Sequence, residues 1–232
     1  MNILETLEEK TVGQIVAERP SRARVFERFG LDYCCGGGKL LAQDCLEKQI
    51  DSSAVLQELM NADLPTSDET DWMAASLTSL ADHIEQTHHA YLKAELPRLD
   101  RLTLKVVTGH GAKHPELAEV REVFVALKAE MEVHMAKEEQ VFFPACRALE
   151  QGSSLPATAL ANPINVLLHE HDDAGRALAR LRELTHGYTP PANVCATYRT
   201  MLDALQQLEA DMHQHVHKEN NILFPKAAHL AG

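Results

Sequence analysis

Four stretches in the C-terminal part of the chain carry apolar residues at alternating intervals of three and four positions, the pattern of a helix that buries one face. They cover about 76–107, 115–149, 163–185 and 193–228. The pattern predicts an all-α fold with an antiparallel four-helix bundle. The buried stripe of the second stretch is Leu117, Val120, Phe124, Leu127, Met131, His134, Glu138 and Val141, and that of the fourth is Tyr198, Met201, Leu205, Leu208, Met212, His215, Glu219 and Ile222.

One motif, H-x-x-K-E-x-x-x-x-F-P, occurs in both of these stretches, at residues 134–144 and 215–225. A His and a Glu four positions apart lie on the same face of a helix. Here both take stripe positions where an apolar residue is expected, so the sequence predicts that they are buried. A buried charge is costly without a partner. Metal ligation would provide a partner for both pairs.

The other two stretches each contribute one further histidine. His171 lies on the stripe of the third, whereas the first offers both His88 and His89. The spacing favours His89, because it precedes His134 by nearly the interval that separates His171 from His215. The bundle is therefore predicted to be a duplicated helix pair. The spacing leaves open whether Glu85, one turn before His89, also approaches the site.

Four histidines and two glutamates exceed the four ligands of a tetrahedral zinc site. The set suits two metal ions, with both carboxylates bridging and two histidines on each ion. Imidazole and carboxylate together favour iron or manganese. We expect a solvent-derived bridge and an exchangeable position on this centre. The remaining histidines are interpreted as structural or solvated: His83, His110, His114, His186, His213, His217 and His229.

The N-terminal part of the chain reads as a small helical domain. Helices are predicted at about 11–19, from a cap at Ser21 to Gly30, at 39–48 and at 53–61. The polar stretch 62–70 is the predicted linker. The sequence therefore predicts a small helical domain over residues 1–65 and the bundle over residues 72–232.

A glycine-rich turn in this small domain contains the adjacent cysteines Cys34 and Cys35. Backbone N–H groups, the start of the next helix and Lys39 are all expected to stabilise a thiolate there. We interpret the pair as a redox, nitrosyl-binding or iron-relaying dithiol; the alternative is that the thiols only pack at a tight turn. The other three cysteines, Cys45, Cys146 and Cys195, are predicted to be small core residues. Lys137 and Lys218 are predicted to be solvated charges beside the buried stripe.

Charge and composition narrow the class of protein. The formal net charge of −12 argues against binding nucleic acid or anionic membranes. Residues 1–10 lack the apolar segment of a secretory signal, and the longest uncharged run, 151–168, contains two prolines and is no membrane span. Five cysteines without such a signal favour reduced thiols in the cytoplasm.

Four motifs together resemble the repair-of-iron-centres proteins, which repair iron–sulfur clusters and contain a hemerythrin-like domain. The motifs are DYCCGG (32–37), HMAKEE (134–139), LLHEHDDAG (167–175) and HVHKENNILFP (215–225). The resemblance implies two non-haem iron ions with an oxo or hydroxo bridge, and a role in recovery from nitrosative and oxidative damage. The implied ligands are His89, His134, Glu138, His171, His215 and Glu219. Dioxygen-carrying hemerythrins use a fifth histidine that nothing here clearly supplies, which argues against reversible oxygen carriage.

Three functions are compatible with this constellation. The centre could reduce nitric oxide to nitrous oxide, which would make the protein an enzyme. It could instead donate iron to damaged or apo iron–sulfur proteins, with Cys34 and Cys35 as a relay or docking element. The third is a sensing module that binds nitric oxide or dioxygen without turnover. The sequence leaves open whether the protein is a homodimer.

Overall fold

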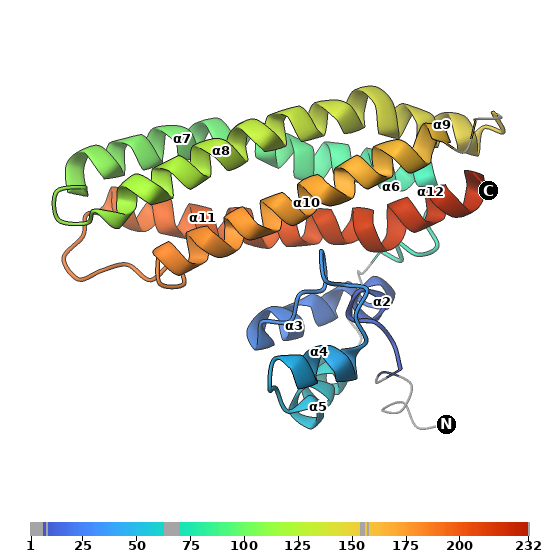
Figure 1. The fold of residues 1–232 in the computed structure, drawn as a ribbon, viewed down its shortest axis with the longest axis horizontal. Coiled ribbons are helices and arrows are strands. Elements are labelled where there is room, and N and C mark those ends of the chain that lie inside the picture. The colour runs from blue at the N-terminus through green and yellow to red at the C-terminus, as the bar shows by residue number, and fades with distance from the viewer. Residues whose placement is uncertain (1–6, 8, 63–69, 154–155, 157, 232) are drawn as a thin grey trace. The chain divides into compact units, whose positions relative to one another are not determined.

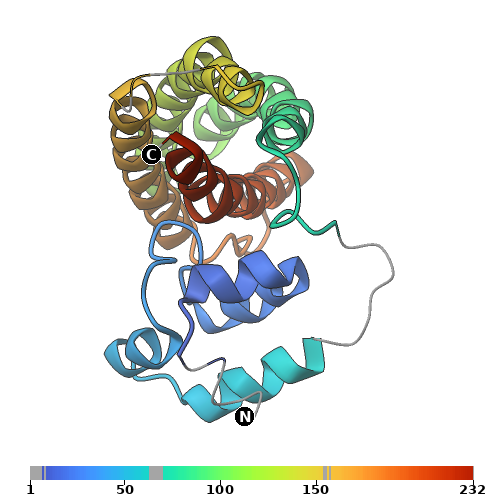
Figure 2. The same ribbon diagram turned by 90° about the vertical axis from the view of Figure 1, so that its right-hand side faces the viewer.

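Helices account for the regular structure throughout the computed structural model, which describes residue 7 and residues 9–62, 70–153, 156 and 158–231 (Figures 1 and 2). Within these ranges the nearest thing to a strand is a single bridge between Thr11 and Leu40. The chain divides into two units: one is Met1–Leu80 with His213–Gly232, and the other is Ala81–Met212. The predicted all-α fold is confirmed.

The unit over Ala81–Met212 is built from long antiparallel helices (Figure 1). In it, α8 packs against both α7 and α10. An ion pair between Arg182 of α10 and Glu209 of α11, with 2.9 Å between Nη2 and Oε2, joins the next two helices. The bounds are α7 Ala90–His110, α8 Glu116–Lys137, α10 Thr158–Leu184 and α11 Ala196–Lys218, of which residues up to Met212 belong to this unit.

Three of the four predicted long helices contain a π-helical segment that the sequence did not predict. These segments lie between α6 and α7, between α8 and α9, and between α11 and α12. The segments are η2 Glu85–His89, η3 Glu138–Phe142 and η4 Glu219–Leu223, and the short flanking helices are α6 Leu77–Ile84, α9 Phe143–Glu150 and α12 Phe224–Ala231.

The π segment η3 is accompanied by a change in which side chains face the core, whereas in η4 the predicted stripe residue Ile222 is buried. Val141, predicted on the buried stripe, is 54% exposed, whereas Phe142 and Phe143 are fully buried. A π turn contains more residues than an α turn, so it rotates the following side chains out of the heptad phase. The prediction for Val141 is therefore wrong.

The third long helix begins earlier than predicted. It starts at Thr158, whereas the sequence placed its first turn at Pro163, which instead lies inside the helix. Proline removes one backbone N–H donor, and it is least disruptive close to the beginning of a helix. Pro163 is the sixth residue of α10 and lies beyond the first turn, so the early start costs one i→i−4 backbone hydrogen bond.

The N-terminal helices agree with the pattern in the sequence except at Ser21, which lies inside the 3₁₀ helix Pro20–Arg22 and does not cap α3, so that the predicted cap is wrong. Thr11 caps α2 with Gln14 in a reciprocal capping box, and Gly30 ends α3 with a left-handed φ of 66°. A buried core that includes Ile15, Phe26 and Leu41 holds these helices together. Most of the predicted linker, residues 63–69, lies outside the described residues. The elements are α2 Val12–Glu18, η1 Pro20–Arg22, α3 Ala23–Phe29, α4 Leu41–Glu47 and α5 Ser52–Ala62.

Among the helices that the structure describes, none is both long enough and apolar enough to span a bilayer.

Candidate metal centre

All six residues predicted as ligands are buried, each with at most 1% of its surface exposed. Three of them lie at the edges of π segments: His89 ends η2, Glu138 begins η3 and Glu219 begins η4. Single π turns inside α-helices are frequent at functional sites, where they redirect side chains. The other three ligands lie in regular helix: His134 in α8, His171 in α10 and His215 in α11.

Within the unit Ala81–Met212, four of these side chains converge on one another. Glu138 Oε2 lies 3.2 Å from His89 Nε2 and 3.3 Å from His134 Nε2. The Nε2 atoms of His134 and His171 are 3.1 Å apart. A proton or a cation between two ring nitrogens stabilises so close an approach. The geometry is that of a set of ligands directed at a common point.

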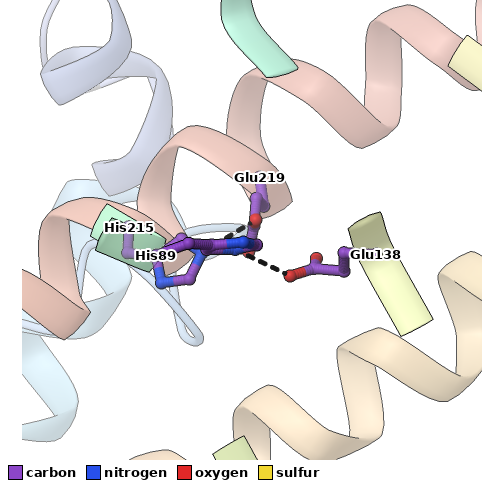
Figure 3. A group of neighbouring side chains, drawn as sticks. All are labelled: His89, Glu138, His215 and Glu219. Atoms are coloured by element: carbon purple, nitrogen blue, oxygen red, sulfur yellow. Dashed lines mark hydrogen bonds and ion pairs between the residues drawn. The ribbon is translucent and has the colours of Figure 1, made fainter. Parts of the chain in front are cut away.

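The second motif copy contains an equivalent pair. His215 Nε2 lies 2.9 Å from Glu219 Oε1, and both side chains are fully buried. Figure 3 shows this pair and the pair of His89 and Glu138, each joined by a dashed line.

Ligand atoms from these six residues form two groups that could each hold a metal ion. One group is His89, Glu138, His215 and Glu219, and the other is His134, Glu138, His171 and Glu219. In each group the ligand atoms lie within 4.8 Å of one another. Both glutamates belong to both groups. The two groups therefore contain all six predicted ligands.

Two further carboxylates orient the histidines, and the sequence reasoning missed both. His89 Nδ1 is 2.8 Å from Glu139 Oε1, and His134 Nδ1 is 2.9 Å from Glu170 Oε2. Each carboxylate also accepts from a lysine, Lys93 on Glu139 and Lys137 on Glu170. A carboxylate on Nδ1 fixes the tautomer and presents Nε2 as a metal ligand.

The hydrogen-bond partners of Glu139 and Glu170 keep both carboxylates ionised. Burial alone would raise the pKa of Glu139, but the hydrogen bonds from Lys93 and His89 hold that pKa below its usual value. The pKa of Glu170 is lowered against the effect of burial in the same way, by Lys137 and His134. Both glutamates are therefore anionic at neutral pH. An anion at Nδ1 makes the imidazole a stronger ligand at Nε2.

The comparisons with known proteins agree with this geometry. A family profile described as a hemerythrin HHE cation binding domain matches residues 80–227, and one described as a domain of unknown function (DUF542) matches residues 8–63. The iron–sulfur cluster repair protein YtfE of Enterobacter sp. (strain 638) is 34% identical over 225 residues, covering 97% of this chain and 98% of that protein. The chain belongs to the repair-of-iron-centres family. YtfE of Escherichia coli O157:H7 is also 34% identical over 97% of this chain and 98% of its own length, and YtfE of Dickeya chrysanthemi (strain Ech1591) is 32% identical over 94% and 96%.

In this member of the repair-of-iron-centres family, the residues considered around His89 have different neighbours. His89 joins a ligand group, whereas His88 Nδ1 lies 2.9 Å from Asp211 Oδ1 in a separate ion pair. Glu85 lies outside both groups and pairs with Arg147 at 2.9 Å. Among the described residues, the metal-ligand groups also contain none of the seven histidines predicted to be structural or solvated. The predicted division of the chain at 1–65 and 72–232 stays a prediction.

The cysteine pair lies in a loop shaped by Asp32. The Asp32 carboxylate accepts from the backbone N–H groups of Cys34, Cys35 and Gly36 at 2.9, 3.0 and 2.8 Å. Contact with Cys35, followed by burial and the charge of Asp32, raises the pKa of Cys34 well above its usual value. Lys39 pairs with Glu47 instead, at 2.6 Å. The prediction of a stabilised thiolate is therefore wrong for Cys34.

Side chains around the second motif hold this loop by its peptide groups. Tyr33 O accepts from Asn221 Nδ2 and from His217 Nδ1, both at 3.1 Å. Cys34 O accepts from Asn221 at 3.2 Å, and Gln214 donates to the Tyr33 hydroxyl at 3.1 Å. The segment that carries His215 and Glu219 is therefore also the docking site of the cysteine loop.

Two further predictions fail because the surroundings of the residues differ from what the pattern suggested. Cys45 and Cys146 are core residues as predicted, but Cys195 is exposed and lies 3.1 Å from His110 Nε2. Backbone N–H groups at the start of α11, and then His110, lower the pKa of Cys195 to about 7. Lys137 is a partly exposed flanking charge, whereas Lys218 is buried.

Proposed function

We propose that this protein is a di-iron protein that takes part in the repair of iron–sulfur clusters damaged by nitrosative or oxidative stress. The observation that carries the proposal is the pair of buried histidine–glutamate groups, which share both carboxylates. The relatives from Enterobacter, Escherichia and Dickeya are iron–sulfur cluster repair proteins by name. Damaged or apo iron–sulfur proteins are the partners that this function requires.

The donor set fits non-haem iron. His89 and His215 would hold one ion, and His134 and His171 the other, with Glu138 and Glu219 shared between them. Imidazole and carboxylate ligands suit iron, and four protein ligands on each ion leave room for a solvent-derived oxo or hydroxo bridge and an exchangeable position. When bound, such a centre supplies two electrons and adjacent open positions for small ligands such as nitric oxide.

The protein's own contribution is orientation, charge and exclusion of water. Glu139 and Glu170 would keep a proton on Nδ1 of His89 and His134, so that Nε2 of each ring is directed at the metal. The complete burial of Glu138 and Glu219 would exclude bulk water, which strengthens their interaction with a cation. Side chains fixed in this way present both metal positions without rearrangement.

Reduction of two nitric oxide molecules to nitrous oxide is the activity that shared carboxylates favour, because they place two metal positions side by side. The test is to expose the reduced, iron-loaded protein to nitric oxide without oxygen and to measure nitrous oxide per di-iron site together with retained iron. A near-stoichiometric or greater yield with iron retained would support a nitric-oxide-reducing enzyme. No nitrous oxide with loss of iron would support iron donation, and stable nitrosylation would support sensing.

We propose that the adjacent cysteines Cys34 and Cys35 take part in passing iron. Replacement of both Cys34 and Cys35 by alanine should leave the di-iron spectrum intact and weaken cluster repair in cells. If this variant repaired clusters as well as the unmodified protein does, the two cysteines would have only a packing role. The cytoplasmic location and the oligomeric state remain predictions.

A further inference from the structure

We propose that Asp32, Cys34 and Cys35 form a separate, mononuclear site for a thiophilic divalent cation such as Zn²⁺ or Fe²⁺. One ligand atom from each of these residues lies within 4.8 Å of the others. The site contains two sulfurs, whereas the histidine–glutamate groups contain none. Its existence does not depend on the proposed repair function, although its use in passing iron would.

The spacing of the sulfurs supports this site. Two thiolates bound to one tetrahedral zinc at about 2.3 Å lie roughly 3.8 Å apart. The Sγ atoms of Cys34 and Cys35 are 3.9 Å apart. A disulfide would require about 2.0 Å, and adjacent cysteines reach it only with strain. The loop therefore holds the two sulfurs at the separation that a shared cation requires.

The electrostatics of the loop favour a cation over thiol chemistry. Cys34 Sγ lies 3.1 Å from Asp32 Oδ1 and 3.9 Å from Cys35 Sγ, so its neighbours are a carboxylate and a second thiol. A nucleophilic or redox-active cysteine requires the opposite, a pKa lowered by positive neighbours. A divalent cation replaces the thiol proton and is attracted by all three groups. The crowding that disfavours a lone thiolate is therefore an advantage for metal binding.

The loop is already shaped for binding. Three backbone N–H groups fix the Asp32 carboxylate, and Asn221 fixes the carbonyls of Tyr33 and Cys34 from the other side. Cys34 Sγ lies 3.1 Å from Asp32 Oδ1, where the thiol donates a hydrogen bond. A cation between these atoms would separate them to roughly 3.6 Å, which is a small adjustment. Ligands held in this way lose little conformational freedom on binding.

Exposure decides what kind of site this is. Asp32 is exposed and Cys35 is half-buried, whereas Cys34 is buried. Structural zinc sites are closed by four protein ligands, but three ligands leave one position for solvent or another donor. A cation held by these three residues would therefore have a fourth position for an incoming ligand. The site is therefore suited to holding a cation transiently and passing it to another thiolate protein.

Cobalt provides a direct test with the full-length protein. Co²⁺ bound by thiolate gives a sulfur-to-metal charge-transfer absorption, which histidine and carboxylate ligands cannot give. We expect this band in the unmodified protein and its loss in Cys34→Ser and in Cys35→Ser. Asp32→Asn should weaken Co²⁺ binding by more than about 10-fold, because it removes the charge of a direct ligand, and residues behind a ligand already have effects on that scale.

The matched controls are Cys195→Ser and Cys45→Ser, which remove an exposed thiol and a buried thiol elsewhere. Both should retain the band. A band that survives the loss of Cys34 and Cys35, or that disappears with Cys195, would overturn the proposal, as would the absence of any band. Because iron in the bundle is measured separately, failure of this site and failure of the di-iron proposal give different results. Retained helical circular dichroism would show that the serine variants remain folded.

Discussion

The two copies of the H-x-x-K-E-x-x-x-x-F-P motif have the same backbone structure but contact different neighbouring residues. In each, an α-helix leads into a π segment that begins with the predicted glutamate ligand, and a Phe-Pro pair follows. In the first copy, Val133 and Gln140 are exposed to solvent. The corresponding residues of the second copy, Gln214 and Asn221, hold the cysteine loop.

This difference lies at positions that the motif leaves free. Ala136 of the first copy corresponds to His217, and Glu139 corresponds to Asn220. Glu139 contacts the predicted ligand His89, whereas His217 and Asn220 donate to carbonyls of the loop. The motif positions therefore specify the candidate metal ligands. The positions between them specify which residues outside the candidate metal centre each copy contacts, and we call this face of each copy its outer side.

The largest expected effect would come from removing what the copies share. Replacing both Glu138 and Glu219 by alanine should abolish the paired-iron signal while helical content largely survives. Each single variant should affect both ions, since each glutamate belongs to both groups. Iron analysis and circular dichroism measure the two quantities. Glu130→Ala, at an exposed site on α8, is the matched control; two irons retained in the double variant would refute the assignment.

A smaller effect is expected from the outer side of the first copy. Glu170→Gln keeps the shape of the side chain but removes the charge that pairs with His134 and Lys137. Metal affinity should fall about 10- to 100-fold, the usual effect of altering a carboxylate behind a ligand histidine. Competition with a chelator measures this affinity. The control is Glu132→Gln, at a half-exposed side chain on α8, which should leave the metal affinity unchanged. An equal loss of affinity in both variants would show that Glu170 has no specific role behind His134.

The outer side of the second copy can be tested at the cysteine loop. Asn221→Ala removes donors from the carbonyls of Tyr33 and Cys34. We expect the free energy of unfolding to fall by about 1–3 kcal/mol, because these buried acceptors lose a partner. Alkylation of Cys34 should become faster. Gln140→Ala makes the same change at the corresponding exposed site of the first copy and should alter stability by less than about 0.5 kcal/mol.

The smallest expected effect is a pH dependence found only in the second copy. Burial lowers the pKa of His217 to about 4, whereas an unfolded histidine titrates near about 6.5. As the pH falls below the unfolded value, the unfolded chain binds a proton before the native protein does, so stability is lost on acidification. Between about pH 7 and pH 5.5 the loss should be about 1 kcal/mol.

His217→Gln keeps a donor to Tyr33 O and should flatten this part of the stability profile, as measured by denaturant unfolding at each pH. His229→Gln, at an exposed position, is the control. Identical slopes in the unmodified protein and in His217→Gln would assign the pH dependence to other groups.

The burial of the predicted ligand pairs could be inferred from the sequence because a polar residue on a heptad stripe is conspicuous. His134 and Glu138 interrupt a series of apolar residues, and the structure buries both. The π segments escaped prediction, because Val141 continues the stripe at regular spacing and nothing local marks the extra residue. Glu170 could not be assigned either, since its role depends on which face of α10 meets α8.

The error at Cys34 has a different cause. Sequence proximity placed Lys39 and a helix start near the thiol, and both would favour a thiolate. In three dimensions Asp32 uses the backbone donors and Glu47 takes the lysine. The electrostatic environment of the thiol thus depends on which groups the backbone N–H donors and the lysine pair with. The order of residues in the sequence does not show these pairings.

The π segments also have a consequence for how these chains tolerate insertions and deletions. Each segment behaves like a single-residue insertion kept within a helix. Deleting Gln140 would restore a regular helix but rotate everything after it by about 100°, which would carry Phe142 and Phe143 off the core. We therefore expect the length of 138–142 and 219–223 to be strictly maintained among relatives, while the loops that join the long helices vary.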